Sequence, residues 1–339
     1  MLTVSIISTK MSFFSQNRKG VVIASIVFLV LFIPTLITGI FYYRSFNKNL
    51  TQEVFSQRET VASLTASAIG LKLQQLTSIV QIYASQPEVI NDVAAGNWSA
   101  AKNIIINLQN DPKNYDYFIG RFLLVDTQGN IKVVFPGIAD EGIGQPDDAF
   151  SEWKTPILEN GADSFVSDVF QRSVYPKNNH IEVLVPIRKA SVLVGVVGIT
   201  VPINEFSDYG KDIDLGSNGF AYVVDRLGHI ITHPKYASDG PIIDYSSIPV
   251  VQKLMQGQSG TAIAYNPIER VERVAAYEPI PTYGWGIISQ EPVKDAFETR
   301  DGILLQVIYL IIAISLIELA IACGILFLVS HRHREHSNV

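Results

Sequence analysis

The sequence predicts an α+β fold, with a long N-terminal helix, two tandem antiparallel-sheet subdomains and a membrane-spanning helix at either end. Three observations lead to this prediction. Two long apolar runs stand near the ends of the 339-residue chain. Between them the apolar spacing changes from a helical to a strand period. The strand pattern then occurs twice in the same order, which indicates a duplication.

Both apolar runs are long enough to cross a membrane. Residues 20–43 contain no charged side chain, and residues 303–330 contain only Glu318. A helix needs ~20 apolar residues to span the hydrocarbon core, and in lipid a single segment satisfies its backbone only as a helix. The first run exceeds the apolar stretch of about 7–15 residues in a signal peptide. We therefore interpret it as a retained anchor.

Basic residues flank the outer ends of both runs, namely Lys10, Arg18, Lys19, Arg332 and Arg334. Because basic flanks stay in the cytoplasm, we expect a two-pass protein of the cell membrane with cytoplasmic tails over residues 1–19 and 331–339. Residues 44–301 then form an extracytoplasmic segment, which 21 basic and 30 acidic side chains keep soluble. Met11 is an alternative start that would shorten the first tail.

Composition and motifs exclude several functions. The net charge of −6 argues against a nucleic-acid binder, and a single cysteine, Cys323, excludes a disulfide framework and a cysteine-rich zinc site. The chain contains no P-loop, serine-hydrolase or zinc-protease motif. His229 and His233 lie four residues apart, but on a strand this spacing separates them widely. We expect no catalysis, no metal and no cofactor.

Residues 45–83 predict a long amphipathic helix that continues out of the first apolar run. One apolar stripe contains Leu50, Val54, Val61, Leu64, Ala68 and Leu71, and a second contains Leu73, Leu76, Val80 and Tyr83. Such a helix pairs with a copy of itself in a homodimer, or packs one stripe against its own domain. Two shorter helices are expected near residues 87–95 and 98–109.

From residue 118 the pattern changes to strands and is then repeated. The predicted hairpins Phe122–Phe135 and Ala221–His233 share the run Val-Asp-x-x-Gly-x-Ile, 99 residues apart. A later Pro-Ile pair recurs after 93 residues, and the proline that ends the next strand recurs after 90. Three offsets in one order predict two α+β subdomains, at about 110–205 and 206–292.

These features resemble a double Cache domain, the extracytoplasmic ligand-binding module of many chemoreceptors and sensor kinases. The resemblance covers residues 45–297 and is carried by the long helix, the Val-Asp-x-x-Gly hairpins, the Gly-Val-Val-Gly run and the Trp-Gly-Ile-Ile ending. It implies that a ligand lies in the membrane-distal subdomain, between its sheet and a capping helix near 147–159 with the loop 163–180.

The resemblance also supplies candidate ligand-binding residues. Members that bind amino acids carry an Arg-x-Trp-Tyr run, then Tyr-x-Asp and a later Asp. The aligned positions here are Ser151-x-Trp153-Lys154, Phe170-x-Arg172 and Thr200. Only the tryptophan matches, and the loss of both carboxylates argues against free amino acids. The candidates for a small anionic ligand, such as a carboxylate, are Trp153, Lys154, Phe170, Arg172, Tyr117, Arg121 and Thr200. The alternative is that Lys154 and Arg172 point into solvent.

The end of the outer segment indicates how a signal could leave it. The last strand, Trp285–Gln290, is expected to run into a helix over Val293–Arg300 that continues into the second span. Ligand binding would then bias a displacement of this span within a homodimer. Glu318 is costly in lipid and is expected to contact a membrane partner. The alternative is a protonated glutamate that faces lipid.

No folded effector domain fits in the nine residues after the second span. The favoured function is a small-molecule sensor that acts on a separate cytoplasmic or membrane partner. A solute-binding accessory subunit of a transporter or kinase complex is an alternative, as is a truncated chemoreceptor or histidine kinase. An extracytoplasmic enzyme ranks third.

Overall fold

The computed structural model describes residues 18–110, 121–136, 142–172, 178–209, 215–216 and 218–337. The chain divides into two compact units, one of Met1–Val54 with Phe297–Val339 and one of Phe55–Ala296. Helix α2, Arg18–Ala84, contributes to both. Most of the tail predicted for residues 1–19 lies outside the described residues.

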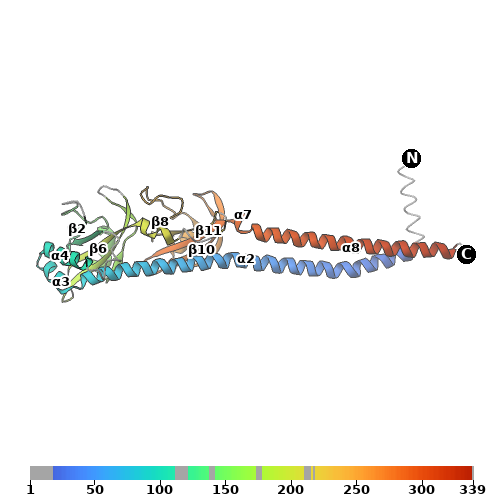
Figure 1. The fold of residues 1–339 in the computed structure, drawn as a ribbon, viewed down its shortest axis with the longest axis horizontal. Coiled ribbons are helices and arrows are strands. Elements are labelled where there is room, and N and C mark those ends of the chain that lie inside the picture. The colour runs from blue at the N-terminus through green and yellow to red at the C-terminus, as the bar shows by residue number, and fades with distance from the viewer. Residues whose placement is uncertain are drawn as a thin grey trace. The chain divides into compact units, whose positions relative to one another are not determined.

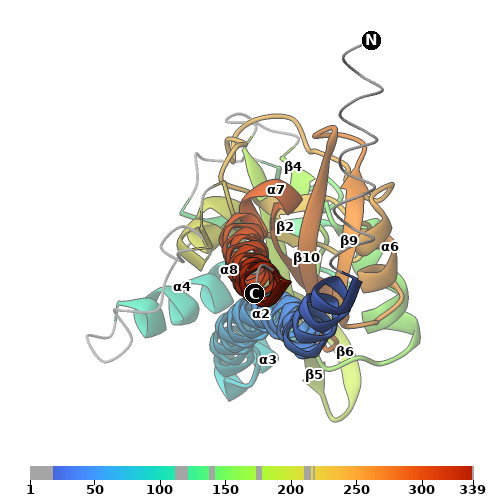
Figure 2. The same ribbon diagram turned by 90° about the vertical axis from the view of Figure 1, so that its right-hand side faces the viewer.

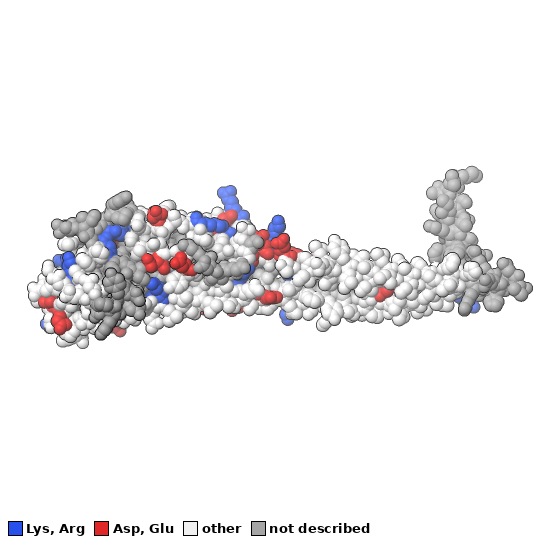
Figure 3. Space-filling view, in the orientation of Figure 1, with Lys and Arg blue, Asp and Glu red and all other residues white. Residues whose placement is uncertain are grey.

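The first unit pairs two long apolar helix segments. The N-terminal part of α2 and helix α8 (Glu298–Ser337) lie side by side (Figures 1 and 2). The most apolar stretch has a mean hydropathy of 2.8 in α2 and 2.7 in α8, and both helices are long and apolar enough to cross a membrane. Gly39 of α2 lies against Ile311 of α8, where a larger side chain would clash. Charged side chains are sparse along these helices on the face shown in Figure 3.

The second unit contains the rest of α2 and two antiparallel sheets, so the predicted α+β fold is confirmed. Helices α3 (Pro87–Ala94) and α4 (Trp98–Gln109) follow α2 where the sequence predicts them. The six-stranded first sheet has the order β2-β1-β6-β5-β3, with β4 also paired to β5. Its strands are β1 (Arg121–Val125), β2 (Ile131–Phe135), β3 (Phe165–Val166), β4 (Phe170–Gln171), β5 (Asn179–Lys189) and β6 (Val192–Pro202).

The five-stranded second sheet repeats this topology in the order β8-β7-β11-β10-β9. Its strands are β7 (Phe220–Val224), β8 (Ile230–Thr232), β9 (Gly260–Asn266), β10 (Val271–Ile280) and β11 (Trp285–Pro292). In both sheets the opening hairpin pairs with the last strand of the subdomain. The remaining short helices are α5 (Phe150–Trp153), the π-helix η2 (Lys154–Glu159), the 3₁₀-helix η3 (Ile203–Tyr209), α6 (Pro249–Met255) and α7 (Val293–Ala296).

The repeated Val-Asp-x-x-Gly run forms the same turn in both sheets. Asp126 Oδ1 accepts hydrogen bonds from the backbone N–H groups of residues 128 and 130, each at 2.9 Å. Asp225 Oδ1 accepts the equivalent pair at 2.9 and 2.8 Å. Gly129 and Gly228 adopt φ of +87° and +85°, a conformation that favours glycine. The same turn geometry therefore explains why the Val-Asp-x-x-Gly run occurs in both hairpins.

Helix α2 packs its second apolar stripe against both sheets. Leu73, Leu76 and Val80 are at most 1% exposed and join one core with inward residues of the first and second sheets. In the first stripe, Leu64 is 66% and Leu71 is 67% exposed. Packing of one stripe against the helix's own domain is confirmed for the second stripe, whereas the other four residues of the first stripe are half-buried.

The link from the second sheet to α8 differs from the prediction. One helix was expected over Val293–Arg300 and onward, but α7 ends at Ala296 and α8 begins at Glu298. The intervening Phe297 is only 3% exposed, and the Arg300 guanidinium stacks 3.8 Å from the centre of its ring. Burial of this ring accompanies the break in the helix.

Candidate ligand pocket on the first sheet

A small cavity of about 170 Å³ lies on the face of the first sheet that α5 and η2 cover. Strand register explains its floor. Arg121 of β1 and Glu182 of β5 both pair with Thr200 of β6, so these three side chains form one row across the sheet. Gly198 lies in the neighbouring row, where the Leu184 side chain packs so closely that a larger residue would clash with it. Phe170 and Arg172, at the end of β4, line the same cavity.

Four of the seven predicted residues are thus brought together, namely Arg121, Phe170, Arg172 and Thr200. Trp153 is fully buried behind the cavity, where its Nε1 donates a 2.6 Å hydrogen bond to Asp147 Oδ2. Lys154 is exposed on η2 and is absent from the described lining of the cavity. For Lys154 the alternative therefore holds, in which its side chain points into solvent. Tyr117 lies outside the described residues.

Three carboxyl groups that the sequence analysis missed also line the cavity, from Asp147, Asp148 and Glu182. Asp147 and Asp148 precede α5 and looked like an ordinary acidic loop. Glu182 gave a clearer signal, because it interrupts the apolar run of an otherwise buried strand. The pocket therefore contains carboxyl groups beside Arg121 and Arg172, and its lining is not simply positive as the sequence predicted.

Glu182 and Asp147 form an acid pair at the floor of the pocket. Burial raises the pKa of Glu182 well above its ordinary value, and the nearby charge of Asp147 raises it further. Burial also raises the pKa of Asp147, although the hydrogen bond from Trp153 opposes this. Thr200 Oγ1 donates to Glu182 Oε1 at 3.1 Å. Burial and the nearby Asp147 carboxyl thus both favour the neutral form of Glu182.

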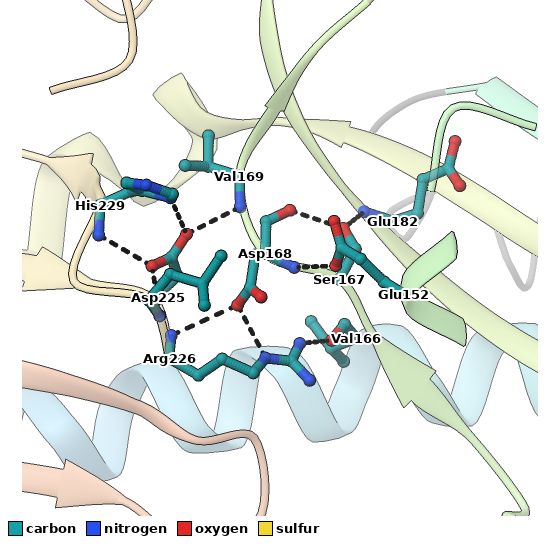
Figure 4. A network of polar contacts seen from close by, with 10 residues as sticks. Glu152, Val166, Ser167, Asp168, Val169, Glu182, Asp225, Arg226 and His229 are labelled. Carbon is teal, nitrogen blue, oxygen red and sulfur yellow. Dashed lines mark hydrogen bonds and ion pairs between the residues drawn. The ribbon is translucent and has the colours of Figure 1, made fainter. Parts of the chain in front are cut away.

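A polar network joins this pocket to the second sheet (Figure 4). The backbone N–H of Glu182 donates to Ser167 Oγ at 2.8 Å, and Ser167 Oγ donates to the Asp168 carbonyl at 2.8 Å. Arg226, in the β7–β8 turn, donates from Nε to Asp168 Oδ1 at 2.7 Å and from Nη2 to the Val166 carbonyl. Figure 4 shows Asp168 facing this turn. A shift of β5 at the pocket would therefore strain contacts to the second sheet.

Carboxyl groups outnumber cations in this network. Asp168 N–H donates to Glu152 Oε2 at 2.8 Å, and Val169 N–H donates to Asp225 Oδ2 at 3.1 Å. Burial raises the pKa of Asp168, the charge of Asp225 adds to this, and Arg226 opposes it. Burial likewise raises the pKa of Glu152. At this contact between the two sheets, Arg226 is thus the cation that lies among the carboxyl groups of Glu152, Asp168 and Asp225.

Comparisons with known proteins agree with this architecture. A family model described as "Cache domain" matches residues 43–300. The periplasmic sensory domain of the chemoreceptor Tlp1 from Campylobacter jejuni matches 73% of this chain and 98% of its own, with a TM-score of 0.55 at 13% identity. The ligand-binding domain of the Pseudomonas fluorescens chemoreceptor CtaA, in complex with L-isoleucine, matches 74% of this chain and 98% of its own, with a TM-score of 0.53 at 17% identity.

A curated relative shows partial similarity in sequence. The methyl-accepting chemotaxis protein McpG from Pseudomonas putida is 22% identical over 161 residues, which is 46% of this chain. The matched part covers 25% of the length of that relative.

Proposed function

Because the chain belongs to the Cache domain family, we propose that it is a membrane-anchored extracytoplasmic sensor of a small molecule and not an enzyme. The single observation that carries this proposal is the pocket on the first sheet, which collects Arg121, Arg172 and Thr200 under a capping helix. The known sensor domains that share the fold support it.

The proposed topology rests on the two apolar helices that flank the Cache domain. Spans over residues 20–43 and 303–330, with basic outer flanks, leave both termini in the cytoplasm. Residues 44–301 are then extracytoplasmic, with subdomains at about 110–205 and 206–292. Protease added to intact cells should cleave this segment, whereas complete protection would contradict the topology.

The proposed ligand carries a carboxylate that Arg121 and Arg172 bind. A guanidinium is well suited to a carboxylate because its donors match both oxygens. A ligand that carries both charges, such as an amino acid, is the second candidate, because Asp147 and Asp148 line the same pocket. CtaA, which shares the fold, is known in complex with L-isoleucine.

Thermal unfolding of the full chain in lipid nanodiscs, with a panel of small carboxylates and amino acids, tests this proposal. At least one compound should raise the melting temperature, and Arg121→Met or Arg172→Met should abolish the rise. Lys154→Met is the matched control, because it removes the same charge outside the pocket and should leave the rise unchanged. The proposed site would be contradicted if every compound that raises the melting temperature of the wild-type chain also raised it in both arginine variants.

Signal output is proposed to pass through α8 to a separate partner. Thr35 Oγ1 donates a 2.6 Å hydrogen bond to Glu318 Oε1, so part of this carboxyl is satisfied within the chain. Glu318 Oε2 is buried without a hydrogen-bond partner among the described residues, and we assign the partner contact to it. If Glu318→Ala leaves association with every membrane partner intact, this assignment is wrong.

A homodimer is proposed through the exposed stripe of α2. Leu64, Leu71 and Ile82 are 66%, 67% and 50% exposed, which favours contact with a second copy. Leu71→Cys, in a chain with Cys323→Ser, should form a disulfide-linked dimer in membranes, and Glu88→Cys off the stripe should not. Equal crosslinking at both positions would contradict this interface.

A further inference from the structure

The second sheet carries a buried polar cluster on the face that α6 covers. Strand register aligns Gln290 of β11 between Phe220 of β7 and Ala275 of β10. The Arg273 guanidinium lies over the Phe220 ring at 4.9 Å, and the His233 ring lies 4.8 Å from the same ring. We call this group, with Tyr222, Tyr236, Tyr245, Lys235 and Glu269, the second-sheet cluster.

Four side chains of the cluster have hydrogen-bond donors that no described residue uses. The unpaired atoms are Tyr222 Oη, His233 Nε2, Arg273 Nη1 and Gln290 Nε2. Their side chains are well buried, since these residues are 0%, 5%, 4% and 1% exposed. Buried polar groups in folded proteins are almost always hydrogen-bonded, so four such donors on one sheet face indicate a bound acceptor.

The protonation of these groups makes them donors. Burial raises the pKa of Tyr222, so its hydroxyl keeps its hydrogen. Burial lowers the pKa of His233, which favours the neutral ring. The backbone N–H of Lys235 donates to His233 Nδ1 at 3.0 Å, which leaves the ring hydrogen on Nε2.

The acceptors within the cluster are already in use. Glu269 Oε2 accepts a 2.5 Å hydrogen bond from Arg273 Nε, and Glu269 Oε1 accepts one from Lys235 at 3.3 Å. His233 Nε2 stands 3.7 Å from Glu269 Oε1, which is too far for a hydrogen bond. The Tyr236 and Tyr245 hydroxyls bond to each other at 2.9 Å. These bonds leave the four donors without a hydrogen-bond partner among the described residues.

Charge and space indicate what this acceptor is. Arg273 and Lys235 outnumber Glu269, so the cluster carries one excess positive charge. His233 and Tyr236 also line a cavity of about 250 Å³ beside β8, so one side of the cluster borders free space.

We propose that the unpaired donors of the second-sheet cluster bind a small oxyanion, of the size of a monocarboxylate, at a site separate from the pocket on the first sheet. Its oxygens accept hydrogen bonds from Tyr222, Gln290 and Arg273, and the excess positive charge of the cluster balances the anion. His233 closes the side that faces the neighbouring cavity.

Acetate is the probe for the test, with gluconate at equal ionic strength as the salt that is too large to enter. Hydrogen exchange by mass spectrometry on the full chain in nanodiscs should show that acetate slows exchange in residues 220–245. Acetate should also raise the melting temperature. Both effects should persist in the Arg172→Met variant, so loss of the first pocket and loss of this site give different results.

Tyr222→Phe and Tyr245→Phe form a matched pair of variants, since each removes one buried hydroxyl. Tyr222→Phe should raise the acetate concentration needed for a half-maximal response at least tenfold. Tyr245→Phe should leave this concentration unchanged, because the Tyr245 hydroxyl pairs with Tyr236. Equal responses in the two variants would overturn the proposal. So would wild-type protein that responds identically to acetate and gluconate, because the donors would then be hydrated or unpaired.

Discussion

The ion pair between Arg58 and Glu291 provides the sharpest stability prediction. Arg58 Nη2 of α2 contacts Glu291 Oε2 of β11, and the side chains are only 6% and 4% exposed. Glu291 lies two residues before α7, where the second sheet ends. Arg58→Met keeps the apolar stem of the side chain but leaves a buried carboxylate without this cation.

The cost follows from burial. Removing one member of a buried ion pair typically costs ~3–5 kcal/mol, because the other charge stays desolvated. Since ~1 kcal/mol shifts the melting temperature of a unit of this size by about 2–4 °C, Arg58→Met should lower it by roughly 6–20 °C. The double variant Arg58→Met/Glu291→Met removes both charges and should recover most of the loss.

Thermal unfolding of the full chain in nanodiscs, followed by circular dichroism, measures the three variants. The reasoning predicts that Arg58→Met and Glu291→Met are each strongly destabilised and that the double variant is more stable than either. A shift below about 2 °C for Arg58→Met would refute it, since burial of the pair would then carry no cost. Additive losses in the double variant would also refute it.

Three further predictions concern the pocket, the network and the spans. Glu182→Gln should flatten the pH dependence of the free energy of unfolding, which denaturant titrations between about pH 4 and 8 measure. A carboxyl whose pKa is raised in the folded state stabilises the fold most below its unfolded pKa of ~4.3, and this stabilisation is lost as the pH rises through the folded pKa. Asp168→Asn and Arg226→Met should be non-additive by roughly 0.5–3 kcal/mol in a double-mutant cycle of unfolding, since one hydrogen-bonded pair joins them. Thr35→Val should destabilise the paired helices by about 1 kcal/mol, because it removes the hydrogen bond to the Glu318 carboxyl. Thr38→Val, at an exposed position, should not destabilise them, and equal effects of the two substitutions would contradict a specific contact.

Local patterns predicted most of the fold because the chain repeats them. The Val-Asp-x-x-Gly run specifies a turn through its own Asp and Gly, so both hairpins could be located without tertiary information. The apolar runs of β5 and β6, most of whose residues are buried, were equally readable. The break at Phe297 was not, because the flanking residues are compatible with a continuous helix and the local sequence does not show that the ring is buried.

The site was only partly predictable, because its chemistry depends on strand register. Arg121 and Thr200 were identified through a family resemblance, but that Glu182 joins their row follows only from the pairing of β5 with β6. The Asp147 carboxyl becomes part of the pocket through a hydrogen bond from Trp153, six residues away. Lys154 was placed in the pocket because it aligns with the end of the Arg-x-Trp-Tyr run of the resembling family, but its side chain is exposed.

We propose that a small molecule binds to the first sheet and thereby acts on the second. Hydrogen exchange on the full chain, with and without a compound that raises the melting temperature, tests both steps at once. We expect slower exchange in β1, β5 and β6 together with a change at the β7–β8 turn that carries Arg226. Protection confined to other segments, or to the first sheet with no change at that turn, would contradict it.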